Sequence, residues 1–137
     1  MSTPRAIGTD LVDVARIRRL CERHPDRFRE RCFTPREQRD AERSGLRRAA
    51  ERYAARFAAK EAVLKSLGTG WSSGVAWTDV EVTLTNRGAP RIELSGGAHA
   101  LAQQLGISAW LCSLTHTSEI AGATVLAVGP ASSISGA

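Results

Sequence analysis

The 137-residue chain has few of the features that mark several large classes of protein. No apolar run approaches the roughly 20 residues that a membrane-spanning helix needs. The three cysteines, Cys21, Cys32 and Cys112, form no CxxC pair, so neither a zinc site nor a disulfide framework is indicated. The N-terminus MSTPRAIGTD has no basic-then-apolar secretion signal. We therefore expect a cytoplasmic protein that has no membrane partner.

Aromatic residues and lysines are also scarce. Aromatics make up 5% of the chain, which gives little support to a nucleic-acid surface built on base stacking. The net charge is +5, and between Arg16 and Arg56 there are 14 arginines against seven acidic residues. Such a segment suits an anionic partner: nucleic acid, a membrane surface, nucleotide phosphates or an acidic protein. Alternating Arg and Glu at i,i+4 spacing could equally form a plain solvated helical surface.

The pattern of apolar and turn residues predicts helices in the first half of the chain. Residues 6–14 read as a strand, and a short helix follows and ends near Pro25. TPRE at 34–37 has the Thr, Pro and Glu of a helix start, and this helix should continue to about residue 44. A longer helix is expected from about Arg47 to Leu67, where Gly68 ends it.

The second half of the chain is rich in predicted strands. Residues 79–85 alternate apolar and polar side chains, and 91–94 are the expected hairpin partner across the turn NRGAP. Ser95 could cap a helix over 96–106, and two closing strands follow it. We expect one α+β domain over residues 1–128, in which a mostly antiparallel sheet packs against the long helix and shorter helices. Residues 129–137 should be a flexible tail.

Three polar residues interrupt the apolar patterns. Asp10 lies within the first strand, on the side of Val12 and opposite Ile7 and Leu11. A buried carboxylate there needs an ion-pair partner or a bound cation, whereas a carboxylate near the strand end could simply face solvent.

Glu61 falls among the apolar positions of the long helix, between Phe57 and Leu64. It could form an exposed i,i+4 pair with Lys65, which stabilises a helix by only a few tenths of a kcal/mol. If Glu61 instead converges with Asp10, the two carboxylates repel each other unless a cation lies between them. Two carboxylates completed by water and phosphate oxygens are a common way to hold Mg²⁺.

His116 shares a strand face with Trp110, Cys112 and Leu114, and therefore points at the core or at a cleft in it. It could be a hydrogen-bonded core histidine, or a group that orients or deprotonates a hydroxyl nucleophile. Two carboxylates, a lysine, a histidine, the Gly-rich segment GTG at 68–70 and a basic surface together suit metal-assisted phosphoryl chemistry. The Walker pattern GxxxxGK[ST] is absent.

Four segments carry a family resemblance. IGTDLVDVARI resembles the first motif of the holo-acyl-carrier-protein synthases, the small bacterial members of the 4′-phosphopantetheinyl transferase superfamily. RFAAKEAVLKSLGTG resembles their second motif, an aromatic residue followed by xxKEAxxK and a Gly-Thr-Gly loop, and SLTHT resembles the third. RFRERCFTPREQ is similar to the helix entry between the first two. The resemblance spans about residues 5–128 and implies the single-repeat form of this transferase fold.

The resemblance implies a reaction and roles for named residues. The phosphopantetheine arm of coenzyme A would move to a serine hydroxyl of an apo acyl carrier protein, and 3′,5′-ADP would leave. Asp10 and Glu61 match the metal ligands, with Mg²⁺ or Mn²⁺ both open. Lys65 matches a phosphate-contacting lysine, Gly68 and Gly70 belong to the coenzyme-binding loop, and His116 matches a histidine near the coenzyme. Glu61, His116 or a metal-bound water could take the serine proton, and the role of Lys60 stays open.

The resemblance also implies partners. Arg16 and the helix after it would dock the acidic carrier protein, so the arginine-rich segment would have an anionic partner. Members of the family's small type are trimers with active sites between subunits. Here Asp10 and Glu61 would come from one subunit and His116 from its neighbour. The carrier could serve fatty-acid, polyketide or peptide synthesis.

Three other functions are compatible with parts of the pattern. A nucleic-acid-binding module would use the arginine helices but would leave Asp10 and Glu61 without a role. A Mg²⁺-dependent nucleotide hydrolase would consume coenzyme A without a carrier protein. An inactive structural trimer would bind a carrier without modifying it, but the intact motifs around Asp10, Glu61 and His116 argue against that.

Overall fold

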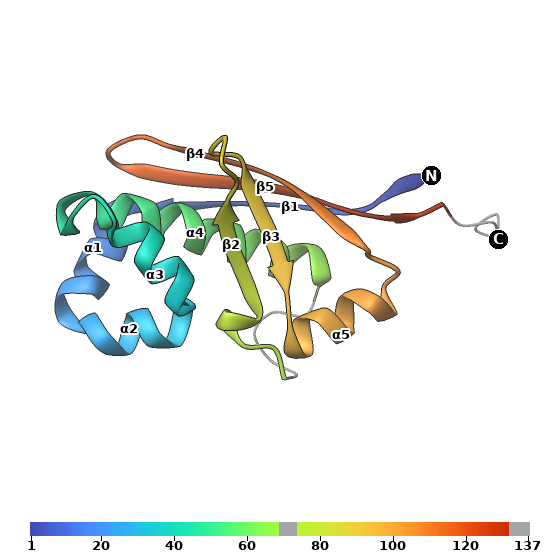
Figure 1. The fold of residues 1–137 in the computed structure, drawn as a ribbon, viewed down its shortest axis with the longest axis horizontal. Coiled ribbons are helices and arrows are strands. Elements are labelled where there is room, and N and C mark those ends of the chain that lie inside the picture. The colour runs from blue at the N-terminus through green and yellow to red at the C-terminus, as the bar shows by residue number, and fades with distance from the viewer. Residues whose placement is uncertain (69–73, 132–137) are drawn as a thin grey trace.

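A computed structural model describes residues 1–68 and 74–131 (Figure 1). Its elements, in chain order, are β1 (Ser2–Asp13), α1 (Val14–Arg23), α2 (Pro25–Cys32), α3 (Pro35–Glu42), α4 (Leu46–Leu67), the 3₁₀ turn η1 (Trp77–Asp79), β2 (Val80–Leu84), β3 (Pro90–Leu94), α5 (Gly96–Gln104), β4 (Ala109–His116) and β5 (Ile120–Pro130). The predicted α+β class is confirmed, because antiparallel strands pack against one long helix and several short ones.

The described strands form two separate antiparallel sheets. One has three strands in the order β1-β5-β4, and the other is the β2–β3 hairpin. In the larger sheet Asp10 lies opposite Ala123, and Ala123 lies opposite Leu114. These three residues point to the same face of the sheet, toward α4, because directly paired residues share a face. The register therefore places Asp10 on the inner face, beside the long helix.

Helix α4 is the centre of the molecule. The sequence predicts one apolar face for it, and that expectation is wrong: every residue from Tyr53 to Leu64 is buried except Glu61. The three-stranded sheet covers one side of the helix, while α1, α3 and β2 contact the others. A helix covered on all sides buries residues at every phase. Its many alanines allow the neighbouring elements to approach closely.

Several predicted boundaries are confirmed. Thr34 and Glu37 form the capping box at the start of α3, since each side chain accepts a hydrogen bond from the other residue's backbone N–H. Gly68 ends α4 with a φ of 79°, in the left-handed region that glycine adopts without strain. The β2–β3 hairpin and both closing strands also form as expected.

Other details differ from the expectations. Helix α2 has no counterpart in the prediction, and the side chain of Ser95 does not cap α5. Asp79 does so instead, because its carboxylate accepts a hydrogen bond from the backbone N–H of Ala98. Strand β5 continues to Pro130, two residues into the predicted tail, because Gly129 and Pro130 pair with Thr3 and Ser2 of β1. Residues 132–137 lie outside the described part of the chain.

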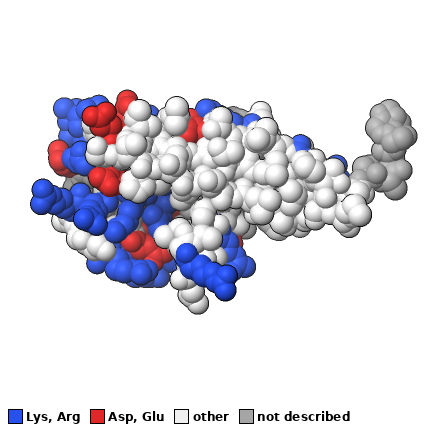
Figure 2. Space-filling view, turned by 90° about the horizontal axis from the view of Figure 1, so that it is seen from above, with Lys and Arg blue, Asp and Glu red and all other residues white. Residues whose placement is uncertain are grey.

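The outer face of the three-stranded sheet is apolar and exposed. Ile7, Leu11 and Leu111 are 69%, 72% and 61% exposed, and Ile7 and Leu111 both flank Leu126 in the register. Figure 2 views the molecule from this side and shows almost no charge over the strands, whereas Lys and Arg gather at the helical end. Within residues 1–68 and 74–131, no helix has the length and apolar character needed to cross a membrane.

Candidate active site

A glycine brings the first strand into direct contact with the central helix. A Cβ atom on Gly8 would lie 2.0 Å from the backbone oxygen of Ala62, so only glycine fits there. Glu61 immediately precedes Ala62, and Asp10 is two residues beyond Gly8 on the same face of β1. The close approach therefore places the two predicted carboxylates on facing elements.

Lys65 contacts Asp10 directly, and the charge of Glu61 also acts on it. Its Nζ atom donates to Asp10 Oδ1 at 2.8 Å and to the backbone oxygen of Thr9 at 3.1 Å. The pKa of Lys65 is raised, first by this hydrogen bond and the charge of Asp10, and to a smaller extent by the charge of Glu61. The Asp10 side chain is only 16% exposed, whereas that of Lys65 is 56% exposed. We call Asp10, Glu61 and Lys65 the carboxylate–lysine group.

The chemistry of this group fits a hard divalent cation. Two carboxylates around one ammonium leave the group with a net negative charge, and their oxygens are the ligands that Mg²⁺ prefers. Among the described residues, no set of three or more His, Cys, Asp or Glu side chains is arranged to hold a metal ion. A cation held by Asp10 and Glu61 would complete its coordination with water and substrate oxygens.

His116 lies at the other edge of the same sheet, in a pocket of about 770 Å³. Its side chain is 50% exposed, with Nδ1 3.7 Å from a carboxylate oxygen of Glu51. It continues the inner face of β4 beyond the half-buried Cys112 and Leu114. His116 is therefore exposed at a pocket and not enclosed in the core, and its role toward a hydroxyl nucleophile stays a prediction.

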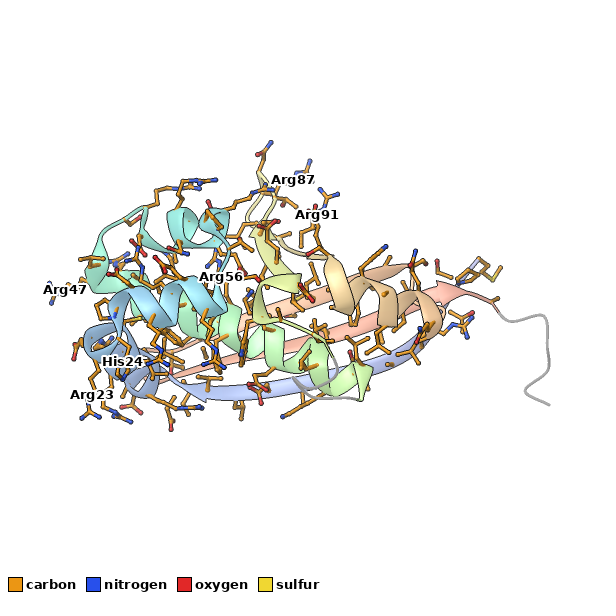
Figure 3. All side chains as sticks on the ribbon, turned by 90° about the horizontal axis from the view of Figure 1, so that it is seen from below. Arg23, His24, Arg47, Arg56, Arg87 and Arg91 are labelled. Carbon is orange, nitrogen blue, oxygen red and sulfur yellow. The ribbon has the colours of Figure 1, made fainter. Side chains whose placement is uncertain are left out.

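Arginines dominate the polar lining of this pocket. They come from α3, the following turn and α4, and the tip of the β2–β3 hairpin closes another side. The lining includes Arg36, Asp40, Arg43, Arg52, Arg56, Asn86, Pro90 and His116, and Asp40 pairs with Arg43 at 3.3 Å. We call it the arginine pocket. Figure 3 shows Arg56 within the helical half, while Arg87 and Arg91 extend outward from the hairpin.

Arg56 is the most unusual residue of the arginine pocket. It is 3% exposed, and its Nε is the one buried side-chain N or O atom among the described residues that lacks a hydrogen-bond partner. Burial lowers its pKa, which is the cost of removing a cation from water. A bound anion would satisfy both the charge and the donor. Sequence reasoning missed Arg56; its position four residues before Lys60, inside the KEA motif segment, was the available signal.

Lys60, whose role the sequence left open, contacts only buried or half-buried groups of the protein among the interactions described for it. It is fully buried and forms an ion pair with the equally buried Glu37 at 2.7 Å. Its ammonium also donates to the backbone oxygens of Trp77 and Val80. Burial lowers the pKa of Lys60, and Glu37 opposes this shift. Lys60 therefore cannot reach a substrate, although it neighbours Glu61 in the chain.

Arg16 lies on the exposed surface of α1, as expected of a docking residue. Its guanidinium carbon is 5.7 Å from the centroid of the Phe57 ring, and Phe57 in turn stacks on Trp77 at 4.7 Å. Stacking on an aromatic ring holds the charge in place while leaving it accessible. Of the two glycines predicted to bind the coenzyme, Gly68 ends α4 close to Lys65, and Gly70 lies outside the described residues.

The structure does not bring all predicted site residues together within one chain. Asp10 is on β1 and His116 on β4, the two edges of the sheet, with Cα atoms about 12 Å apart from strand spacing and register. On α4, Lys65 contacts Asp10 of β1, whereas Arg52 and Arg56 line the arginine pocket. The helix thus lies between the carboxylate–lysine group and the arginine pocket.

Comparison with known proteins identifies the family. Residues 6–124 match the family model of the 4′-phosphopantetheinyl transferase superfamily. A holo-[acyl-carrier-protein] synthase of Desulforudis audaxviator is 52% identical over 128 residues, which cover 93% of this chain and 95% of that protein. An acyl carrier protein synthase of Plasmodium yoelii with ADP bound superposes with a TM-score of 0.85 at 31% identity, covering 96% of this chain and 99% of the other.

A third similar protein carries a bound coenzyme. The Helicobacter pylori holo-[acyl-carrier-protein] synthase in complex with coenzyme A has a TM-score of 0.77 and 28% identity, covering 88% of this chain and 98% of that one. The chain therefore belongs to the 4′-phosphopantetheinyl transferase superfamily, among the holo-acyl-carrier-protein synthases. It is a transferase enzyme, and the fold expected from the three motifs is confirmed.

Proposed function

We propose that the enzyme transfers the 4′-phosphopantetheine arm of coenzyme A to a serine hydroxyl of an apo acyl carrier protein. The observation that carries this proposal is the carboxylate–lysine group, in which Lys65 lies 2.8 Å from Asp10. This arrangement suits a diphosphate, because the ammonium can contact a phosphate oxygen while the carboxylates hold a cation. The relatives named holo-[acyl-carrier-protein] synthase, one with coenzyme A bound, support the same substrates.

The proposed reaction is a displacement at phosphorus. The serine oxygen forms a bond to the phosphorus that bears pantetheine, and the bond from that phosphorus to the bridging oxygen of the diphosphate breaks. The serine proton passes to a base, and 3′,5′-ADP leaves with the bridging oxygen. Lys65 holds a phosphate oxygen and opposes the negative charge that grows on the leaving group.

Asp10 and Glu61 would hold Mg²⁺ or Mn²⁺, which neutralises charge on the diphosphate and stabilises the leaving group when bound. The half-buried position of Asp10 limits its contact with water and keeps its carboxylate aligned with Lys65. Glu61 remains a candidate for the base, alongside His116 or a water molecule. The base is the candidate that lies within hydrogen-bond distance of the serine hydroxyl when both substrates are bound.

The arginine pocket is the proposed place for the nucleotide half of coenzyme A. Its volume of about 770 Å³ is within the usual range for small-molecule sites. Arg56 supplies a buried guanidinium with a free Nε donor, and His116 lies at the same pocket. The guanidinium groups suit a phosphate, and the planar guanidinium and imidazole groups suit an adenine ring.

We further propose a homotrimer in which each active site combines two subunits. The two groups of residues lie on opposite sides of α4, so one coenzyme could contact both most simply if a neighbouring chain supplied its arginine pocket. The exposed apolar face with Ile7, Leu11 and Leu111 gives such an assembly a surface to bury. Size-exclusion chromatography with light scattering on the wild type and on Leu111→Glu tests this: the variant should dissociate and lose activity.

The basic helical end is the proposed docking surface for the acidic carrier protein. Arg16 is exposed on α1, and Figure 2 shows further Lys and Arg residues around the same end. Electrostatic steering would raise the association rate and would weaken with added salt. We place the reaction in the cytoplasm and in fatty-acid or related acyl-chain synthesis.

Intact-mass spectrometry of an apo acyl carrier protein tests the central proposal. The carrier would be incubated with the enzyme, coenzyme A and Mg²⁺, with EDTA in a parallel sample. We expect the carrier to gain one phosphopantetheine, and the gain to disappear with EDTA. Breakdown of coenzyme A without a change in carrier mass would instead favour a nucleotide hydrolase. No change in either, across several carriers, would reject both activities.

A further inference from the structure

A buried ion pair joins three elements that line the arginine pocket. Lys60 on α4 and Glu37 on α3 are both 0% exposed, and their charged atoms are 2.7 Å apart. The other carboxylate oxygen of Glu37 accepts a hydrogen bond from the backbone N–H of Val82 on β2 at 2.9 Å. One side chain pair therefore connects α3, α4 and β2.

Each of these elements supplies pocket residues close to its point of attachment. Arg36 immediately precedes Glu37, Arg56 is one helical turn before Lys60, and Leu84 is two residues beyond Val82 on the same strand face. Any change in how the three elements are spaced would therefore move the walls of the pocket. The pair itself does not line the pocket.

The β2–β3 hairpin depends on these contacts for its position. Within the described residues it pairs with no strand of the larger sheet, and a two-stranded hairpin alone is marginally stable. Besides the bond to Val82, Lys60 donates to the backbone oxygen of Val80, and Thr34 donates to the Glu81 carboxylate at 2.6 Å. Three consecutive residues of β2 are thus held by α3 and α4 or by the residue that caps α3.

We propose that Lys60 and Glu37 are positioning residues for the arginine pocket. They hold α3, α4 and the hairpin at the spacing that binds the nucleotide half of coenzyme A; this inference rests on the proposed function of that pocket. A buried ion pair is seldom more stabilising than well-packed apolar residues, so stability alone does not explain it. Its directional bonds to Glu37, Trp77 and Val80 fix geometry that an apolar side chain of the same volume would leave adjustable.

The double variant Lys60→Met/Glu37→Gln removes both charges while keeping similar volumes. Isothermal titration with 3′,5′-ADP would measure binding, and steady-state assays would give separate KM values for coenzyme A and the carrier. We expect 3′,5′-ADP to bind about tenfold or more weakly, with the KM for coenzyme A raised alike, because several polar contacts would shift. The KM for the carrier should stay within twofold.

Two further variants separate positioning from stability. Ile107→Ala truncates a core residue just before β4, at the end of the strand away from His116 and the arginine pocket. It should lower the melting temperature without changing the affinity for 3′,5′-ADP. Glu37→Gln alone keeps the bonds of one oxygen but replaces the acceptor for Val82, and should weaken 3′,5′-ADP binding by about threefold to tenfold. It serves as the test if the double variant does not fold.

The outcomes separate a failure of the positioning role from a failure of the proposed transferase function. Wild-type-like 3′,5′-ADP binding by both Lys60→Met/Glu37→Gln and Glu37→Gln, with only their melting temperatures lowered, would overturn the positioning role and leave the transferase proposal intact. Failure of the wild-type enzyme to bind 3′,5′-ADP or to modify a carrier would overturn the proposed function and this inference with it. If Ile107→Ala unexpectedly weakened 3′,5′-ADP binding as much as the Lys60→Met/Glu37→Gln variant does, the loss would reflect general destabilisation and would also reject the positioning role.

Discussion

Replacing Gly8 with alanine should damage both stability and catalysis, because it forces β1 away from α4. The added Cβ would lie 2.0 Å from the backbone oxygen of Ala62 and 2.9 Å from its carbonyl carbon. Contacts below 3.0 Å essentially never occur for real Cβ atoms, so the strand or the helix must shift by about 1 Å. The obstacle is backbone, so rotation of a side chain cannot relieve it.

The size of both effects follows from this displacement. Overpacking of a buried site costs about 1–3 kcal/mol, which corresponds to a fall in melting temperature of roughly 3–12 °C for a domain of this length. A misplacement of about 1 Å at an active site can reduce the rate by about 10²-fold. Asp10 should move with β1 and separate from Lys65, which is 2.8 Å away in the native enzyme.

Differential scanning fluorimetry and the carrier-modification assay would measure the two effects of Gly8→Ala. Gly122→Ala is the matched control for stability, since its Cβ would meet the side-chain tips of Leu11 at 3.0 Å and Thr115 at 3.4 Å, and the backbone oxygen of Asp10 only at an ordinary contact distance of 3.7 Å. Leu11 is 72% exposed in a single chain but lies on the face that the proposed trimer buries, so the oligomeric state of Gly122→Ala would be measured alongside its melting temperature. A Gly8→Ala enzyme with native melting temperature and native turnover would refute the claim that this glycine positions Asp10.

Three other changes test separate parts of the molecule. Glu61→Gln should lower metal-dependent turnover by about 10²–10³-fold without changing the melting temperature, in assays over a range of Mg²⁺ concentrations. Arg16→Glu should raise the KM for the carrier about tenfold at low salt and leave that for coenzyme A unchanged. Burial raises the pKa of Cys32 and of Cys112 to about 11, from an ordinary value of 9.0. The folded protein then holds these protons more tightly than the unfolded chain, so stability is intact below pH 9 and is lost as the pH rises toward 11. Thermal melts across this range should show the loss, and Cys112→Ala should reduce it.

For each of these three predictions, a specific result would contradict it. Near-normal turnover of Glu61→Gln at low Mg²⁺ would remove Glu61 from the metal site. An unchanged carrier KM for Arg16→Glu, at both low and high salt, would place the docking surface elsewhere. If Cys112→Ala and the wild type lose stability with the same slope above pH 9, the Cys112 thiol does not contribute to the alkaline transition.

Local sequence signals predicted most of the helices and strands. The Thr34–Glu37 capping box, the glycine end of α4 and the β2–β3 hairpin depend on residues within a few positions of one another, and each formed as expected. Helix α2 and the end of β5 were missed. A segment as short as α2 has too few residues to show a clear periodic pattern. The end of β5 forms because Gly129 and Pro130 pair with Thr3 and Ser2 at the other end of the chain.

The sequence by itself determined the family and the chemistry available to it, because the motifs around Asp10, Glu61 and His116 are contiguous and can be read directly. Only the tertiary structure decided which of these side chains meet. The contact of Lys65 with Asp10 joins residues 55 positions apart, and that of Lys60 with Glu37 joins residues 23 apart. The burial of Arg56, and the separation of His116 from Asp10 by the width of a sheet, likewise arise from packing around α4. Such contacts depend on how distant segments fill space together, which no local pattern of residues encodes.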